Sequence, residues 1–85
     1  MSDLAKKFEA AAAAVKKLKD DPGNAAKLQL YALYKQGTDG DVEGKRPGFT
    51  DMVGRAKFDA WAKVKGTSKN DAMQQYIDLV KALGG

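Results

Sequence analysis

The chain has 85 residues and carries 15 basic against 11 acidic side chains, so its formal net charge is +4 at pH 7. It contains no cysteine and no histidine, which excludes disulfides and metal sites built on thiolate or imidazole ligands. Because nucleophilic and acid–base catalysis most often uses these two residues, we expect no enzyme activity. The length predicts a single domain, residues 1–85, with a modest hydrophobic core.

The sequence shows neither a membrane span nor a secretion signal. Its longest apolar run, Ala10–Val15, is far shorter than the roughly 18 residues that indicate a transmembrane helix. The segment Met1–Lys7 is not followed by the apolar stretch of a signal peptide. We therefore expect a cytoplasmic protein.

Two helices are predicted in the first half of the chain. In residues 4–19, which are rich in Ala, Lys and Leu, apolar side chains recur at steps of three and four, as in an amphipathic helix. Turn residues between Asp20 and Asn24 end this helix. A second helix is predicted from Asn24 to Gly37, with the glycine as its end.

The segment Thr38–Thr50 is irregular and contains three glycines and a proline. Connections of this length are uncommon in a small domain unless they serve a purpose. One purpose is geometric, because a chain that joins two helices running in the same direction must travel back along the bundle.

Two further helices complete the predicted fold. One runs from Asp51 to Lys65 and the other starts at Ser68, where the sequence Ser-Lys-Asn-Asp resembles a capping box with Asp in place of Glu or Gln. No segment alternates in the manner of a strand. The fold class predicted from these patterns is all-α, a four-helix bundle.

The loop contains a partial match to a calcium site. Residues 39–44, Asp-Gly-Asp-Val-Glu-Gly, have the oxygen ligands and the sixth-position glycine of an EF-hand loop. The twelfth position, which must supply a bidentate glutamate, is Thr50, and Lys45 and Arg46 add positive charge. We therefore expect a polar loop and no metal site.

Two basic patterns leave alternatives open when taken alone. Tyr31, Tyr34 and Lys35 share one helical surface, which suits either a nucleotide or a core tyrosine beside a surface lysine. Lys57, one turn before Trp61, is equally ambiguous. The dispersed lysines permit a small basic nucleic-acid-binding module, although aspartates interleave with them and no Arg/Asn/Gln recognition helix is present.

A family resemblance connects these segments. Residues Tyr31–Asp41 resemble the Tyr-x-x-Tyr-Lys-Gln-x-Thr-x-Gly-Asp signature of acyl-CoA-binding proteins. Further matching blocks follow in the family's order, at Arg46–Gly48, Ala56–Trp61, Lys65–Lys69, Asp71–Met73 and Tyr76–Ile77. The resemblance extends from Phe8 to Leu83.

The resemblance implies both a topology and a function. It implies a bundle in up-down-down-up order, with the long crossover between helices two and three. It implies that the protein binds medium- and long-chain acyl-CoA esters with high affinity. The implied role is that of a non-catalytic intracellular carrier and pool former in transport and fatty acid metabolism, which needs no cofactor. The implied partners are long-chain acyl-CoA and, transiently, membranes or acyl-CoA-using enzymes, not nucleic acid. We expect a monomer, with nucleic-acid binding as the alternative function.

The resemblance also assigns roles to individual residues. Lysine is a good point-charge partner for phosphate, and buried CH₂ groups contribute roughly 0.8 kcal/mol each, so both halves of the ligand would be recognised. On the CoA side, the resemblance implies Tyr31 beside the adenine and Lys35 and Lys57 at the 3′-phosphate. Lys16 on helix one and Tyr76 on helix four complete the nucleotide side. Tyr34 is the adjoining family position and is implied to be more structural. Leu28 and Ala56 are the implied lining of the acyl groove.

Four positions depart from the family's usual pattern. Phe58 stands in place of Trp, Val53 in place of Lys, Lys27 in a stretch that is often apolar, and Gly37 in place of Ala. The first three bear on acyl-chain preference and phosphate affinity rather than on the class of ligand. Glycine at position 37 is expected to loosen the end of helix two by about 0.5–1 kcal/mol.

Overall fold

The computed structural model describes residues 3–84 as four helices. These are α1 (Asp3–Val15), α2 (Asn24–Thr38), α3 (Met52–Lys63) and α4 (Lys69–Ala82). No strand occurs within this described range, so the predicted all-α, four-helix fold is confirmed. None of these helices is long and apolar enough to cross a membrane.

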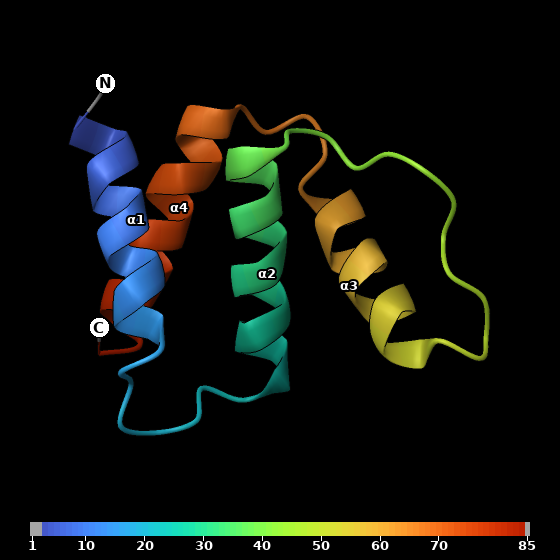
Figure 1. Cartoon of the computed structure of the whole chain (residues 1–85), viewed down its shortest axis with the longest axis horizontal. Helices are drawn as coiled ribbons and strands as arrows, with labels where there is room; N and C mark the ends of the chain where they lie inside the picture. The colour runs from blue at the N-terminus through green and yellow to red at the C-terminus, as the bar shows by residue number, and fades with distance from the viewer. Residues whose placement is uncertain (1–2, 85) are drawn as a thin grey trace.

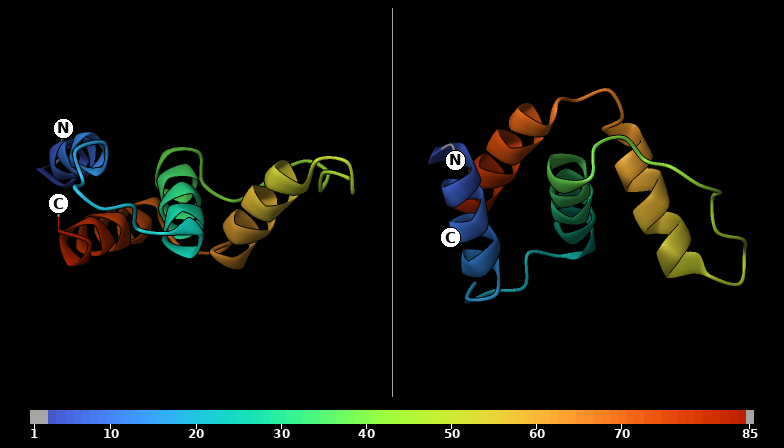
Figure 2. Two further views of the ribbon diagram at one scale, coloured as in Figure 1. Left: turned by 90° about the horizontal axis from the view of Figure 1, so that it is seen from below. Right: turned by 45° about the horizontal axis from the view of Figure 1, so that its top comes forward.

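The helices form a flat array. α1 packs on α4, α4 on α2, and α2 on α3, which gives a particle of 37 × 30 × 15 Å. Figure 1 shows α2 and α3 running in one direction and α1 and α4 in the other, an arrangement that fits the predicted up-down-down-up order. The crossover swings around the outside of α3, and the views in Figure 2 show how thin the array is.

The hydrophobic core lies between α1, α2 and α4. Its buried side chains are Phe8, Ala11, Leu30, Leu33, Tyr76, Ile77 and Val80. The Phe8 ring stacks on Tyr34 with centroids 5.3 Å apart and meets the edge of Tyr76 at 5.1 Å. α3 contributes no buried residue, so it lies outside this core and depends on its seam with α2 and on polar bonds.

The main polar anchor of α3 is Gln36, a fully buried glutamine at the end of α2. Its Nε2 donates to Asp41 Oδ1 at 2.8 Å and to the carbonyl of Thr67 at 2.7 Å, while its Oε1 accepts from Trp61 Nε1 at 3.1 Å. One amide therefore ties α2 to the crossover, to α3 and to the α3–α4 turn. Burial of an amide is tolerated when its donors and acceptors are paired in this way.

Two further bonds complete this network. Trp61 Nε1 also donates to the carbonyl of Gly40 at 2.9 Å, and Asp41 Oδ1 also accepts from the backbone N–H of Gly66 at 2.8 Å. The bond from Gly66, and then that from Gln36, hold the pKa of the Asp41 carboxyl below its ordinary value. Part of the signature segment thus stabilises the fold, independently of any ligand.

A second anchor holds the middle of the crossover to α3. Arg46 donates to Asp59 through two parallel bonds, Nε–Oδ1 at 2.7 Å and Nη2–Oδ2 at 2.6 Å. This pairing raises the pKa of Arg46 and lowers the pKa of Asp59. The crossover is therefore held at two points, near its start by Asp41 and near its middle by Arg46.

Helix α1 ends earlier than predicted. It stops at Val15 rather than at Lys19, so Lys16 follows the helix instead of belonging to it. The backbone N–H of Lys17 bonds only three residues back, to the carbonyl of Ala14 at 2.9 Å. This tighter turn satisfies the last helical carbonyls and redirects the chain towards α2.

The prediction that Gly37 ends α2 is also wrong. The helix continues to Thr38, and Gly37 is buried within it. A Cβ atom at this position would lie 3.1 Å from Met73 Cγ and 3.3 Å from Phe8 Cζ. Glycine therefore allows the side chains of Phe8 on α1 and Met73 on α4 to approach α2 closely.

The turn between α3 and α4 contains the predicted signals. α3 begins at Met52 and ends at Lys63, two residues before its predicted end, and Gly66 follows in the left-handed region with φ 91°. The hydroxyl of Ser68 accepts from the backbone N–H of Asp71 at 3.1 Å. This confirms the predicted helix cap.

Candidate ligand-binding site

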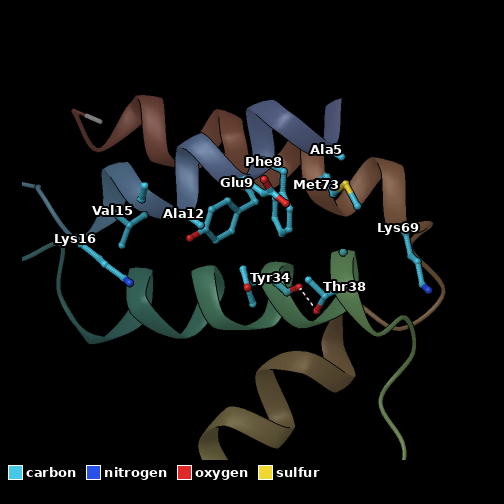
Figure 3. Close-up of a pocket in the computed structure, with 13 residues that line it drawn as sticks. Ala5, Phe8, Glu9, Ala12, Val15, Lys16, Tyr34, Thr38, Lys69 and Met73 are labelled. Carbon is cyan, nitrogen blue, oxygen red and sulfur yellow. Dashed lines mark hydrogen bonds between the residues drawn. The ribbon is translucent and has the colours of Figure 1, made fainter. Parts of the chain in front are cut away.

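The first groove lies between α1, α2 and α4, where the backbones of α1 and α2 stay apart although the Phe8 and Tyr34 rings meet. It has a volume of about 890 Å³ and an apolar floor that includes Phe8, Ala12 and Met73. In Figure 3, Lys16 lies at one end of the groove and Lys69 at the other. An elongated anionic ligand could therefore meet a cation at each end.

Two tyrosines line this groove in different environments. Tyr34 is 43% exposed, whereas Tyr76 is buried, and their ring centroids are 6.0 Å apart. Burial, and secondarily the neighbouring Tyr34, raises the pKa of the Tyr76 phenol. Tyr76 therefore stays protonated at neutral pH and can act as a hydrogen-bond donor.

The second groove lies between the first turns of α2 and α3 and is smaller and more apolar. It has a volume of about 400 Å³ and is lined by Asn24, Lys27, Leu28, Tyr31, Met52, Val53, Ala56 and Lys57. Nζ of Lys57 lies 5.3 Å from the centroid of the Tyr31 ring. A cation and an aromatic face thus meet beside an apolar channel.

Lys27 does not bring an unpaired charge to this groove. Its Nζ forms an ion pair with Asp21 Oδ2 at 2.9 Å. The backbone N–H of Gly23 and then Lys27 lower the pKa of Asp21. The stem of Lys27 can line the groove while its charge is compensated outside the apolar lining.

Lys35 lies on α2 one turn after Tyr31 and lines neither groove. Its Nζ pairs with Asp39 Oδ2 at 3.1 Å and lies 5.5 Å from the centroid of the Trp61 ring. The bond to Asp39 is the main reason that the pKa of Lys35 is raised. An anionic ligand would have to share this ammonium with Asp39.

The predicted site residues therefore fall into two sets on either side of α2. Lys16, Tyr34 and Tyr76 line the first groove. Leu28, Tyr31, Ala56 and Lys57 line the second. Lys35 follows the α2 residues of both sets along the helix. One ligand that contacts both sets would have to cross α2.

Sequence reasoning missed several lining residues. The first groove also contains Glu9, Thr38, Lys69 and Met73, and the second contains Met52 and Val53. The spacing of Ala5, Phe8, Glu9 and Ala12 along α1, continued by Lys16 just after it, could have indicated a shared face. A third hollow of about 710 Å³ borders both Leu28 and Ala56, so hollows flank both sides of the α2–α3 seam.

Among residues 3–84, no group of three or more acidic side chains is placed to hold a metal ion.

Comparison with known proteins identifies the family of this chain. A profile described as acyl CoA binding protein matches residues 5–80. The chain belongs to the acyl-CoA-binding protein family. Acyl-CoA-binding protein homolog 1 of Caenorhabditis elegans is 50% identical over 76 residues, which cover 89% of this chain and 88% of that protein.

A solved structure and a longer relative agree with this placement. The crystal structure of Oryza sativa acyl-CoA-binding protein 2 superposes with a TM-score of 0.90 at 48% identity, covering 94% of this chain and 89% of that one. Enoyl-CoA delta isomerase 2 of Rattus norvegicus is 51% identical over 76 residues. The match covers 89% of this chain but only 19% of that relative, so the acyl-CoA-binding region is a small part of the longer protein.

Proposed function

We propose that this chain, as one domain, binds medium- and long-chain acyl-CoA esters with high affinity and acts as a non-catalytic intracellular carrier and pool former. The observation that carries the proposal is the position of Tyr31 and Lys57 at the side of an apolar groove. An amphiphile with a nucleotide head and an aliphatic tail needs these two environments side by side. Membership of the family supports the same class of ligand.

The acyl chain is proposed to lie in the groove between α2 and α3. Leu28 and Ala56 contact its length, and Met52 and Val53 extend the apolar lining. Val53 in place of the family's common lysine increases the apolar surface at this position. Because each buried CH₂ contributes roughly 0.8 kcal/mol, longer chains should bind more tightly until the groove is filled.

The CoA head is proposed to lie across α2, within reach of three lysines. Lys16 and Lys57 form no ion pair within residues 3–84, so their charges are available to phosphate groups. Lys35 joins them by partly exchanging Asp39 for a phosphate oxygen. The Tyr31 ring offers a face for the adenine, and Tyr76 offers a hydroxyl donor.

Titration calorimetry with palmitoyl-CoA, held below its micelle concentration, tests the proposal. We expect tight one-to-one binding and a change in Trp61 fluorescence, whereas free CoA and free palmitate bind much more weakly. No heat and no fluorescence change with palmitoyl-CoA would reject the proposal. Release of free thiol during prolonged incubation would contradict the non-catalytic part.

Lys57→Gln gives a more specific test of the phosphate contacts. We expect the affinity for palmitoyl-CoA to fall about tenfold, the loss typical of one charge-assisted bond, about 1.4 kcal/mol. Lys81→Gln is the matched control, because it removes the same charge from the exposed last turn of α4. Equal affinities for the two variants would remove Lys57 from the site.

The nucleic-acid alternative finds no support in the reported relatives. It predicts salt-sensitive binding to unrelated duplexes. A gel-shift assay at low salt distinguishes the two functions, since an acyl-CoA carrier leaves such duplexes unshifted.

A further inference from the structure

The groove between α2 and α3 has a basic side chain at each end. At one end Lys57 lies beside the Tyr31 ring. One turn earlier on α2 comes Leu28, and the first turn of the helix adds Lys27 and Asn24 to the lining. Because α2 and α3 run in the same direction, the first turns of both helices lie at the far end of the groove (Figure 1). A polar end thus follows the apolar stretch.

The ammonium of Lys27 can exchange its present partner. Its Nζ pairs with Asp21 Oδ2 at 2.9 Å, but the two side chains are 54 and 67% exposed, and exposed pairs of this kind contribute little to stability. Asp21 also accepts from the backbone N–H of Gly23 at 2.8 Å, which is the main reason that its pKa is lowered. Asp21 therefore stays ionised and hydrogen-bonded when another carboxylate takes its place at Lys27.

The rest of the lining favours the same kind of end group. Asn24 brings a side-chain amide, which can donate hydrogen bonds, to this end of the groove. Among the described residues, none that lines this groove is acidic. An acyl chain that ends in a methyl group gains nothing from Asn24 or from the ammonium of Lys27. A chain that ends in a carboxylate meets a cation and an amide donor there.

The length of the groove determines which acyl chains reach this end. From Asn24 to Tyr31 the axis of α2 advances about 10 Å. An extended chain advances about 1.2 Å for each bond, so an acyl chain of about ten carbons covers this distance. A medium-length chain that begins beside Tyr31 therefore places its last carbon near Lys27, whereas a longer chain must pass it.

We propose that this groove accepts medium-chain acyl-CoA esters whose chain ends in a carboxylate, and that Lys27 binds this end group. The inference rests on the proposed function, because it names a class of ligand for the same groove. It gives a purpose to a lysine that stands in a stretch often apolar in the family. Lys27 is then a specificity-determining residue, and the contacts of the CoA head are unchanged.

Calorimetric titrations of the full-length chain with decanoyl-CoA and decanedioyl-CoA at low salt test this inference. We expect the unmodified chain to bind the two esters within about threefold of each other, because Lys27 replaces part of the hydration of the terminal carboxylate. Lys27→Met should bind decanoyl-CoA more tightly, since methionine extends the apolar lining, and decanedioyl-CoA about tenfold more weakly. The decanoyl-CoA titration also shows that the variant is folded.

Two further variants separate the end group from general charge effects. Lys81→Met removes the same charge from the exposed last turn of α4 and should change neither affinity by more than about twofold. Asp21→Asn removes the carboxylate that competes for Lys27, so it should strengthen the binding of decanedioyl-CoA about threefold and leave that of decanoyl-CoA unchanged.

The ratio of the two affinities decides the outcome. If Lys27→Met changes the binding of decanoyl-CoA and decanedioyl-CoA by the same factor, or changes neither, Lys27 does not bind the end group and the inference is overturned. The same holds if Lys81→Met alters the ratio as much as Lys27→Met does. These results leave the carrier function intact, whereas a chain that binds neither decanoyl-CoA nor palmitoyl-CoA would overturn both.

Discussion

The indole N–H of Trp61 on α3 donates to the buried side-chain oxygen of Gln36 on α2 at 3.1 Å. No residue of α3 is itself buried. α3 therefore depends on a hydrogen-bonded amide for the alignment that a hydrophobic core gives the other helices. This has a consequence for the groove, because α3 supplies one of its two walls.

Gln36→Leu tests this dependence. Leucine has a similar size but cannot bond to the carbonyl of Thr67, to Asp41 or to the indole N–H of Trp61, so three hydrogen bonds are lost. We expect the free energy of unfolding to fall by about 2 kcal/mol in urea denaturation, since each lost hydrogen bond contributes about 0.5–1.5 kcal/mol net. Gln29→Leu, on the exposed side of the same helix, should change it by less than about 0.5 kcal/mol.

If the two glutamine variants prove equally stable, Gln36 is not an anchor. If Gln36→Leu is destabilised yet binds palmitoyl-CoA as tightly as the unmodified chain, the alignment of α3 does not depend on this amide.

The Asp41 carboxylate makes the same network sensitive to acid. Its bonds with Gly66 and Gln36 hold its pKa below the ordinary value of 3.8, so the unfolded chain takes up a proton more readily than the folded one. The resulting stability is present above about pH 4 and is lost as the pH falls through the folded pKa. We expect the melting temperature to drop in this acid range.

Asp41→Asn should reduce that drop, since asparagine can still accept hydrogen bonds but does not titrate. Asp78→Asn serves as the control, because Asp78 bonds only within α4, to Gln74. Asp21 and Asp59 also have lowered pKa values, so part of the acid dependence will remain. An unchanged slope in Asp41→Asn would show that this carboxylate does not link stability to pH.

The ion pair between Lys35 and Asp39 predicts an unusual gain of affinity. Nζ of Lys35 lies 3.1 Å from the Asp39 carboxylate, which competes with any phosphate bound there. Asp39→Asn removes both the competition and a negative charge. We expect palmitoyl-CoA to bind about fivefold more tightly at low salt, corresponding to about 1 kcal/mol of exposed-charge interaction, and the gain to shrink at high salt.

Asp78→Asn removes the same charge from the exposed face of α4 and is again the control. If it raises the affinity as much as Asp39→Asn does, the effect comes from net charge alone and Lys35 is not a phosphate contact.

The parts of this structure that local chemistry determines could be predicted from the sequence. Each helix follows from its apolar period, and Ser68 caps α4 as expected. The end of α1 was missed by four residues, because the turn towards α2 depends on tertiary packing. The role of Gln36 was not foreseen, since a glutamine on a helix ordinarily faces water.

The residues of the candidate site could be predicted from the sequence, but their arrangement in space could not. Its residues were named through the family resemblance, and taken singly Tyr31 and Lys57 were ambiguous. Their division between two grooves arises because α1 and α4 lie on one side of α2 and α3 on the other, which no periodicity in the sequence reports.

Gly37 gives a last test, because two effects of opposite sign meet at this position. Alanine in a helix is favoured over glycine by about 0.5–1 kcal/mol. However, its Cβ would lie 3.1 Å from Met73 Cγ and 3.3 Å from Phe8 Cζ, and overpacking typically costs about 1–3 kcal/mol. We therefore expect Gly37→Ala to destabilise the chain by about 1 kcal/mol, contrary to the expectation that glycine only loosens the helix end.

A double-mutant cycle with Met73→Ala separates the two effects. Removing the Met73 side chain opens the space that the new Cβ needs, so the cost of Gly37→Ala should fall by at least about 0.5 kcal/mol in that background. The same cycle with Met52→Ala, a methionine far from Gly37 at the start of α3, should show no coupling. Stabilisation by Gly37→Ala in the unmodified chain would mean that Met73 moves aside freely and that the close approach of α2 and α4 does not require glycine.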